Sequence, residues 1–373
     1  MPFLCACGAE IKTDEKIHRH QVYELPELKL WVTEYQLAQG LCQHCEEAHT
    51  ASLPEGVSWG ITGPHLTSFM SELVAKYHLS RREVRAFLKE HLQFCISLGT
   101  VFNKQKLVNA VLESPVNALL PVVKADPVVH MDETGHRQEG QTAWMWVMTT
   151  GEAAYYEIVP FRGTKVLKSW MSDFQGIIVS DRYSAYNYFP SYHRQLCWSH
   201  LKRDFTRISE KPEKVISRIG DNLLNDENQL FKCWHQFKQQ SITRDELIRQ
   251  CEPIRQRVGE SLEQCTYTDP QFKVVRLAKN LLDHFHALWT FIYEEGVEPT
   301  NNHAEQCLRP WVSWRKKYFG TRSVYGAQYV ARSASWIMTC RLQSRSAFDY
   351  LTQAIHNHFC HTPAPPLIEK LSH

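Results

Sequence analysis

The hydrophobic period of the chain changes at Val128, and this change restricts the possible folds more than any other feature. Between about residues 62 and 112, apolar residues recur at the spacing of one helical face. From Val128 onward come three short runs rich in β-branched and aromatic residues, which predict an antiparallel meander. They read PVVHMD, TAWMWVMTT and AAYYEIV. Helices followed by strands of this kind predict a mixed α/β core.

The predicted core continues with alternating helices and strands. We expect a helix from about Thr164 to Asp173, followed by the apolar run GIIVSD, which would form a strand beside the first one and end at Asp181. A further strand would end in HRQLCWSH. The pattern of residues 207–297 is almost wholly helical, which predicts an all-α insertion in the core.

The helical segment before the core has readable limits. Ser80 is a plausible N-cap for the helix RREVRAFLKEHL. The segment ESPVNALLPVVKADP contains three prolines, so we expect it to form the boundary with the core. An earlier apolar stripe predicts a helix; its members are Leu66, Phe69, Met70, Leu73 and Tyr77.

Composition limits the class of protein. The chain has 373 residues, 43% of them hydrophobic and 12% aromatic, which is typical of a globular protein. The 42 Lys and Arg residues nearly balance the 40 Asp and Glu residues, so any DNA-binding surface must be a local patch. We see no apolar stretch of membrane-spanning length and no signal peptide, so we expect no membrane association and a cytoplasmic location.

Four of the twelve cysteines form two close pairs near the amino terminus, namely Cys5 with Cys7 and Cys42 with Cys45. Two such pairs are typical of a structural Zn²⁺ site in a small β-rich knuckle. The first pair is C-x-C, where C-x-x-C is usual, and His44 or His49 could replace one thiolate. The alternative is ordinary reduced cysteines without metal.

Three acidic residues, Asp132, Asp181 and Glu305, occur in the settings VVHMDET, GIIVSDRYSAY and EPTNNHAEQCLRP. The first two would lie at strand ends, and adjacent strands are only about 5 Å apart. Glu305 would lie on a helix that begins near Pro299, Thr300 and Asn301, whose polar side chains suit an N-terminal cap. Carboxylates from separate elements can hold two divalent cations. The alternative is that each acid is a solvated strand-end or cap residue.

The motifs DETG, SDRYSAY, CWSHLKRDF, NNHAEQCLRPWVSWRKKYFG and TCRLQSRSAFDYL closely resemble the insertion sequence 66 (IS66) family of bacterial transposases, over residues 120–360 and more weakly over the cysteine module. The resemblance implies an RNase H-like (retroviral integrase-like) core with a DDE triad and two Mg²⁺ or Mn²⁺ ions. It places the triad at Asp132, Asp181 and Glu305, and it also implies a zinc-binding module ahead of the core.

The resemblance also identifies a Cys-x-x-His element, which here is Cys197 and His200. This pair could form half a Zn²⁺ site, but two further ligands are not evident nearby in the sequence, so we favour a structural or DNA-orienting role. Glu133 should point to the opposite side of the strand from Asp132, as a supporting or surface group.

Basic and aromatic residues alternate after Glu305 and predict DNA contact. We favour Arg315 and Lys316 most, and regard Lys202 and Arg203 as weaker candidates; a solvated helical face is the alternative. The basic residues of this segment are Arg309, Arg315, Lys316, Lys317 and Arg322, interleaved with Trp311, Trp314, Tyr318 and Phe319.

These observations predict a transposase that cleaves the ends of an insertion sequence and joins the 3′ ends to target DNA. Its partners would be DNA, further copies of itself and small accessory proteins of the element. One alternative is a catalytically inactive or truncated, zinc-containing DNA-binding derivative, and another is a zinc hydrolase centred on Cys197 and His200.

The predicted organisation has six parts. They are a zinc-binding module (1–55), a helical, helix-turn-helix-like DNA-binding segment (62–115), the first part of the core (122–206), an α-helical insertion (207–297), the last part of the core (298–360) and a tail (361–373).

Overall fold

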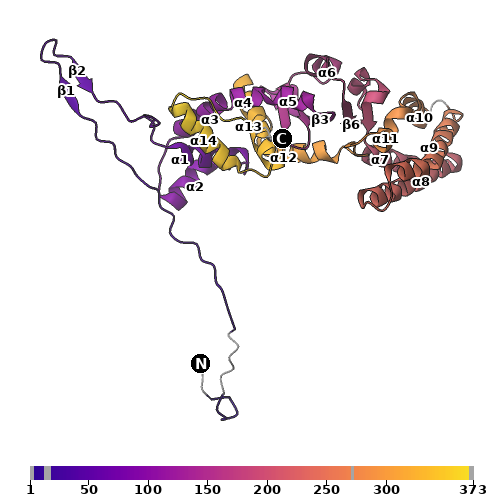
Figure 1. The fold of residues 1–373 in the computed structure, drawn as a ribbon, viewed down its shortest axis with the longest axis horizontal. Coiled ribbons are helices and arrows are strands. Elements are labelled where there is room, and N and C mark those ends of the chain that lie inside the picture. The colour runs from indigo at the N-terminus through magenta and orange to yellow at the C-terminus, as the bar shows by residue number, and fades with distance from the viewer. Residues whose placement is uncertain (1–3, 12–17, 270–272, 369–373) are drawn as a thin grey trace.

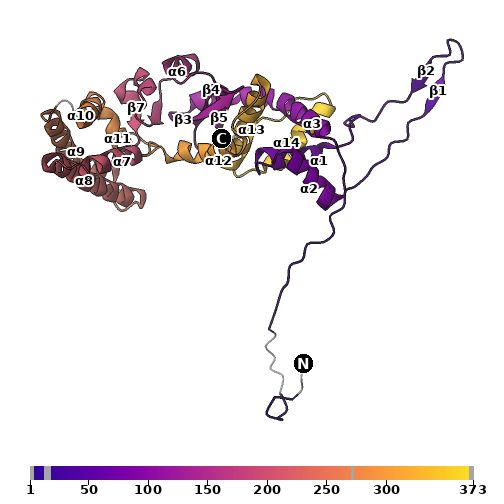
Figure 2. The same cartoon turned by 180° about the vertical axis from the view of Figure 1, so that it is seen from behind.

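The structure is a computed structural model that describes residues 4–11, 18–269 and 273–368. Portions of the predicted amino-terminal module (1–3 and 12–17) and of the tail (369–373) therefore lie outside the described residues. In Figures 1 and 2 a central sheet separates two groups of helices. None of the described helices is long and apolar enough to cross a membrane.

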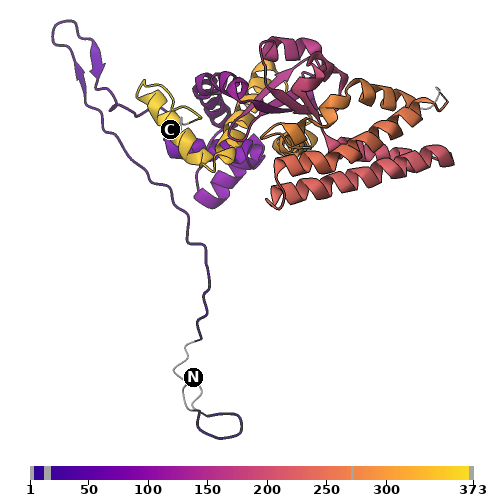
Figure 3. The ribbon, with the colours of Figure 1, turned by 45° about the vertical axis from the view of Figure 1, so that its right-hand side comes forward.

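The amino-terminal region is extended and exposed. Its strands β1 (Gln39–Leu41) and β2 (Ala48–Thr50) pair antiparallel. Figure 3 shows this hairpin at the end of a long extended segment, away from the helices. Among the described residues of the predicted β-rich knuckle, the structure contains this hairpin and a tight turn at Cys5.

Three helices follow and share a small apolar core: α1 (Pro64–Ala75), α2 (Arg81–Leu92) and α3 (Leu98–Val111). The cap prediction is confirmed, because the Ser80 hydroxyl accepts the Glu83 N–H while the Glu83 carboxylate accepts the Ser80 N–H. The predicted place of Tyr77 on the buried stripe is wrong, because α1 ends at Ala75 and the tyrosine is exposed.

The proline-containing segment before the core is helical. It forms α4 (Glu113–Asn117) and α5 (Leu119–Ala125), which pack into the main core. Pro115 and Pro121 each occupy the first turn of a helix, where the missing N–H has no intrahelical acceptor. These prolines therefore start helices, and the expected boundary is a packed part of the molecule.

The central sheet has five strands in the order β5-β4-β3-β6-β7. The predicted meander is confirmed, since β3 pairs antiparallel with β4 and β4 with β5. The next two strands run parallel to β3, as expected for a strand ending before Asp181. The strands are β3 (Val128–Gln138), β4 (Gln141–Thr149), β5 (Ala154–Val159), β6 (Ile177–Ser180) and β7 (Arg194–Leu196).

Helices cover both faces of the sheet. On one face Trp146 packs edge-on against Trp170 of α6 (Thr164–Met171) and Tyr186 of the 3₁₀ helix η1 (Ser184–Tyr188). On the other face Tyr156 donates to a carbonyl of α12 (Asn302–Tyr318). The remaining elements near this core are η2 (Ser191–His193), α13 (Val324–Leu342) and α14 (Ala347–Phe359).

The predicted α-helical insertion is present and has its own apolar core. Val179 and Leu196 connect this core to strands β6 and β7. Figure 1 shows the long helices gathered at the end of the molecule away from α1 and α2. This core begins before the predicted bound of residue 207, because α7 (Trp198–Ser209) packs in it. The other elements of the insertion are α8 (Lys214–Lys238), α9 (Arg244–Thr266), α10 (Lys273–Asp283), η3 (Phe285–Leu288) and α11 (Thr290–Tyr293).

The end of α12 joins the sheet at a glycine. Gly320 has a φ of +110°, and a Cβ there would lie 2.1 Å from the carbonyl oxygen of Arg137. This close approach lets the Thr321 N–H donate to that same carbonyl oxygen, at 2.7 Å. Helix α12 is thereby fixed along β3, which carries Asp132.

Candidate active site

Asp132 lies within β3, on the face of the sheet that α12 covers. The residues opposite it in the next strands are Val147 and then Tyr156, which contacts α12. One oxygen of the Asp132 carboxylate accepts the Glu133 N–H at 2.9 Å. The side chain is thereby held at a fixed place on a rigid strand.

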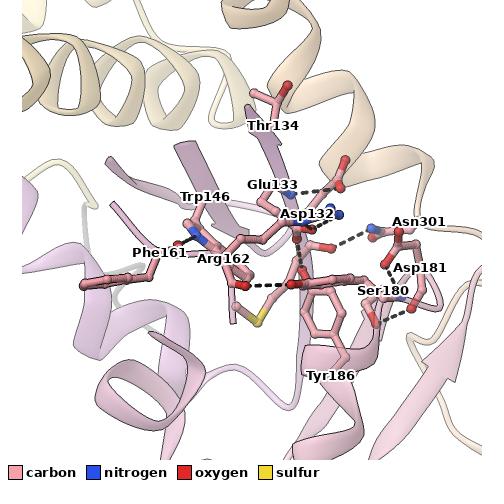
Figure 4. A network of polar contacts seen from close by, with 12 residues as sticks. Asp132, Glu133, Thr134, Trp146, Phe161, Arg162, Ser180, Asp181, Tyr186 and Asn301 are labelled. Carbon is pink, nitrogen blue, oxygen red and sulfur yellow. Dashed lines mark hydrogen bonds and ion pairs between the residues drawn. The ribbon is translucent and has the colours of Figure 1, made fainter. Parts of the chain in front are cut away.

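Asp181 follows directly after β6. The parallel register pairs Val128 with Ile177 and His130 with Val179, an offset of 49 residues. Continued by two positions, that offset sets Asp181 beside Asp132 (132 + 49 = 181). The Asp181 carboxylate accepts the Tyr183 N–H at 2.8 Å, which fixes its orientation. Figure 4 shows both aspartates. Asp181 follows the end of β6, as predicted, whereas Asp132 lies within β3, so its predicted place at the end of a strand is wrong.

Glu305 lies in the first turn of α12, which packs on β3 and β4. The sequence predicts that the Asn301 side chain caps this helix, and this prediction is wrong in part. Asn301 occupies the N-cap position, but its side chain makes no cap hydrogen bond and points to β3 instead. The helix start is therefore fixed to the strand that carries Asp132.

A pocket of about 290 Å³ lies where these elements meet. Both Asp132 and Glu305 line it, together with the guanidinium-bearing residues Arg203 and Arg309. The pocket is thus lined by both carboxylate and guanidinium groups.

The electrostatics of the site favour a bound cation. Burial, and then the neighbouring carboxylates of Glu133, Asp181 and Glu305, raise the pKa of Asp132 to about 8. One buried oxygen of Glu305 has no hydrogen-bond partner. Carboxylates that repel one another, one of them with an unpartnered oxygen, fit hard divalent cations, which prefer oxygen ligands. The residues that could hold such ions are Asp132, Asp181 and Glu305.

The structure brings the Cys-x-x-His element to the same place. The Cys197 thiol, the His200 imidazole and the Glu305 carboxylate each offer one atom, and these atoms lie within 4.8 Å of one another. His200 Nδ1 is 3.4 Å from Glu305 Oε1, but the geometry makes no hydrogen bond. Burial, followed by the charge of Arg203, lowers the pKa of His200. His200 therefore contacts Glu305 without forming a strong ion pair.

Glu133 points to the face opposite Asp132, as predicted, but it is no surface group. Its carboxylate is buried, 2.7 Å from a guanidinium nitrogen of Arg162, and accepts the Tyr186 hydroxyl at 2.7 Å. The Arg162 guanidinium in turn stacks over the ring of Tyr183. Figure 4 shows this network behind the aspartates. Sequence reasoning missed Arg162, because a lone arginine in a turn carries no local signal.

The amino-terminal cysteines lie in two separate turns. Within the described residues, Cys5 and Cys7 do not meet Cys42 and Cys45 in any cluster of metal-ligating atoms. In each turn the first thiol has a lowered pKa, because nearby N–H groups favour its thiolate. A zinc site that joins the pairs therefore stays a prediction.

The predicted DNA-contacting residues divide into two groups. Arg315 donates to the Gly135 carbonyl of β3, and Lys317 donates to the His78 carbonyl at 2.8 Å, so both hold α12 in place. Lys317 is nevertheless exposed, as are Arg309, Lys316 and Arg322, which form the second group. Of the interleaved aromatic residues, Trp311 is buried and Phe319 is exposed.

Comparison with known proteins places this arrangement in a family. A family model described as "Transposase IS66 family" matches residues 60–329, a span that includes all three carboxylates. A protein described as "Uncharacterized protein y4qI", from Sinorhizobium fredii (strain NBRC 101917 / NGR234), is 21% identical over 236 residues. The match covers 57% of this chain and 43% of that relative, so the chain spans less than half of the relative's length.

Proposed function

Because this chain belongs to the IS66 family of transposases, we propose that it is a DNA transposase with a DDE triad. Asp132, Asp181 and Glu305 would hold two divalent cations, Mg²⁺ or Mn²⁺. The enzyme would cleave the ends of its element and join the 3′ ends to target DNA. The observation that carries this proposal is that Asp132 and Glu305 line one pocket while the register of β3 and β6 sets Asp181 beside Asp132.

We also propose that the core is RNase H-like. The support is a sheet in which a three-strand antiparallel meander is extended by two parallel strands. Such a sheet sets the middle of β3 beside the carboxyl end of β6 and the start of α12, and this geometry would position the triad.

Each part of the site has a distinct task. Bound cations would supply activation of the attacking oxygen and stabilisation of the leaving oxygen. Asp132 lies on β3 and Asp181 directly follows β6, so the hydrogen bonds that join these two strands restrict the relative movement of the two carboxylates. Glu305 completes the set from a helix that packs on β3. Both reacting groups are oxygens on phosphorus, so no covalent intermediate with the protein is needed.

The exposed guanidinium groups of Arg203 and Arg309 supply phosphate contacts at the pocket, and Lys316 and Arg322 extend the basic surface. Two element ends must be held together, so the active form on DNA is at least a dimer. The Zn²⁺ of the amino-terminal module and the accessory proteins belong to the same proposal.

The test is a cleavage and strand-transfer assay on DNA that carries the element ends, with Mg²⁺ or Mn²⁺. We expect Asp181→Asn to abolish both reactions while DNA binding persists. Asp221→Asn, which changes an exposed aspartate of α8, is the control and should keep full activity. Full activity of Asp181→Asn would refute the triad. Binding without cleavage by the unaltered protein would identify an inactive DNA-binding derivative.

A further inference from the structure

We infer that Asn301 and Cys197 are positioning residues that hold the three carboxylate-bearing elements in register. This inference rests on the proposed function, since it assigns a task within the same site. The observation is a chain of hydrogen bonds that joins β3, β6, α7 and α12 through the backbone and side chains of these two residues.

Asn301 connects α12 to β3. Its side-chain amide donates to the Met131 carbonyl at 2.7 Å, and its side-chain oxygen lies 3.1 Å from Nδ1 of His130. Met131 directly precedes Asp132, and Asn301 precedes Glu305 by about one turn of helix. Asn301 is only 1% exposed, so water cannot replace these contacts. One buried amide therefore sets the position of Glu305 relative to Asp132.

Cys197 connects the same point to β6. Its N–H donates to the Ser180 carbonyl at 2.9 Å, and Ser180 directly precedes Asp181. Its sulfur accepts the Asn301 N–H at 3.1 Å. The thiol is 1% exposed, and burial raises its pKa, so the neutral acceptor form is favoured. Cys197 thereby links Ser180, which precedes Asp181, to Asn301, and Asn301 in turn links Asp132 and Glu305.

The spacing of the Cys-x-x-His element follows from this arrangement. Cys197 occupies the N-cap position of α7, and His200 lies in the first turn, where its imidazole contacts Glu305. A cysteine that accepts a backbone N–H and a histidine beside a catalytic carboxylate need no metal of their own. The element orients the site, and it is not half of a zinc site.

The first experiment compares Asn301→Ala with Asn302→Ala, a control at the adjacent and exposed asparagine. Binding of Mn²⁺ is measured by calorimetry on the full chain without DNA, and the Mg²⁺ dependence of cleavage is measured separately. Loss of a group that orients metal ligands typically weakens metal affinity by about 10- to 100-fold. We expect such a loss for Asn301→Ala, with a matching shift of the Mg²⁺ requirement, and at most about a twofold change for Asn302→Ala.

Asn301→Asp covers the case in which Asn301→Ala does not fold. It keeps the size and the acceptor towards His130 but removes the donor to Met131, so its Mn²⁺ affinity should fall as well. Metal affinity equal to that of the unaltered protein in either folded variant overturns the inference. If the unaltered protein binds Mn²⁺ but cleaves no end DNA, the proposed function fails instead.

The second experiment tests the thiol. Cys197→Ser keeps an acceptor and should retain more Mn²⁺ affinity than Cys197→Ala. The control is Cys251→Ala, at a buried cysteine of the insertion, which should leave the Mn²⁺ affinity unchanged. Zinc content is measured on the same proteins. Stoichiometric zinc that is lost only in the Cys197 variants would show a metal ligand and overturn the positioning role.

Discussion

At the scale of single residues, the acidic site is costly to fold without cations. The pKa of Asp132 is raised from 3.8 to about 8, chiefly by burial and secondarily by neighbouring carboxylates. Below pH 4 the side chain is protonated in both the folded and the unfolded states. As the pH rises from about 4 to 8, the unfolded state releases the proton first, so this residue lowers the free energy of unfolding progressively.

Asp132→Asn should therefore stabilise the cation-free protein. One pKa unit corresponds to about 1.4 kcal/mol, so we expect the free energy of unfolding at pH 8 to rise by at least about 1 kcal/mol. The gain should shrink towards pH 4 and should be absent in the control Asp221→Asn. Urea unfolding between pH 4 and 8, with a chelator present, measures it. An equal gain at both ends of this range would contradict the electrostatic origin.

At the scale of elements, β3 serves two sites with its two faces. Asp132 points to α12, whereas Glu133 points to the ion pair with Arg162 on the opposite face. The Tyr183 hydroxyl donates to the Arg162 carbonyl, and the Tyr183 N–H donates to Asp181. The buried ion pair thus ties β3 to the turn that carries the second aspartate.

Arg162→Met should leave the Glu133 carboxylate buried with only the Tyr186 hydroxyl as a partner. Breaking a buried pair in this way costs about 3 kcal/mol or more. Lys238→Met breaks an exposed pair with Glu298 and should cost less than about 1 kcal/mol. Chemical denaturation at pH 8 measures both variants. Equal losses of stability in the two variants would show that burial of Glu133 does not determine the cost of breaking its ion pair. In the double variant, Glu133→Gln added to Arg162→Met should recover part of the stability that Arg162→Met loses.

At the scale of the whole molecule, two apolar cores meet at the site. One contains the sheet with α12 and α13, and the other belongs to the helical insertion. Arg203 comes from α7 of the insertion and Arg309 from α12, yet both line one pocket. A basic surface made from both bodies would bind DNA only when they are docked.

Arg203→Ala and Arg309→Ala should each weaken DNA binding by a similar factor for all sequences. Each lost phosphate contact lowers the slope of log affinity against log salt by about 1. Arg218→Ala, in α8 of the insertion, is the control and should leave the slope unchanged. Fluorescence anisotropy with labelled end DNA at several salt concentrations provides the measurement. An unchanged slope in both pocket variants would remove these residues from the DNA-binding surface.

The sequence predicted the elements better than it predicted the partners of polar side chains. Hydrophobic period located β3 to β6 and the helical insertion, because the period is a local property of consecutive residues. The same reasoning placed Arg315 on DNA and Asn301 in a helix cap, whereas both side chains bind backbone carbonyls of β3. Those carbonyls lie about 170 to 180 residues away in the chain, where no local pattern can reveal them.

The sequence by itself determined the candidate carboxylates and the two strands that position Asp132 and Asp181, although Asp132 lies within its strand and not at the end. Only the tertiary structure decided that an offset of 49 residues aligns Asp132 with Asp181, and that α12 returns Glu305 to the same place. It also decided that Glu133 is buried with Arg162. The physical reason is that a buried polar group must pair with whatever folding brings near it, and this choice depends on the packing of distant elements.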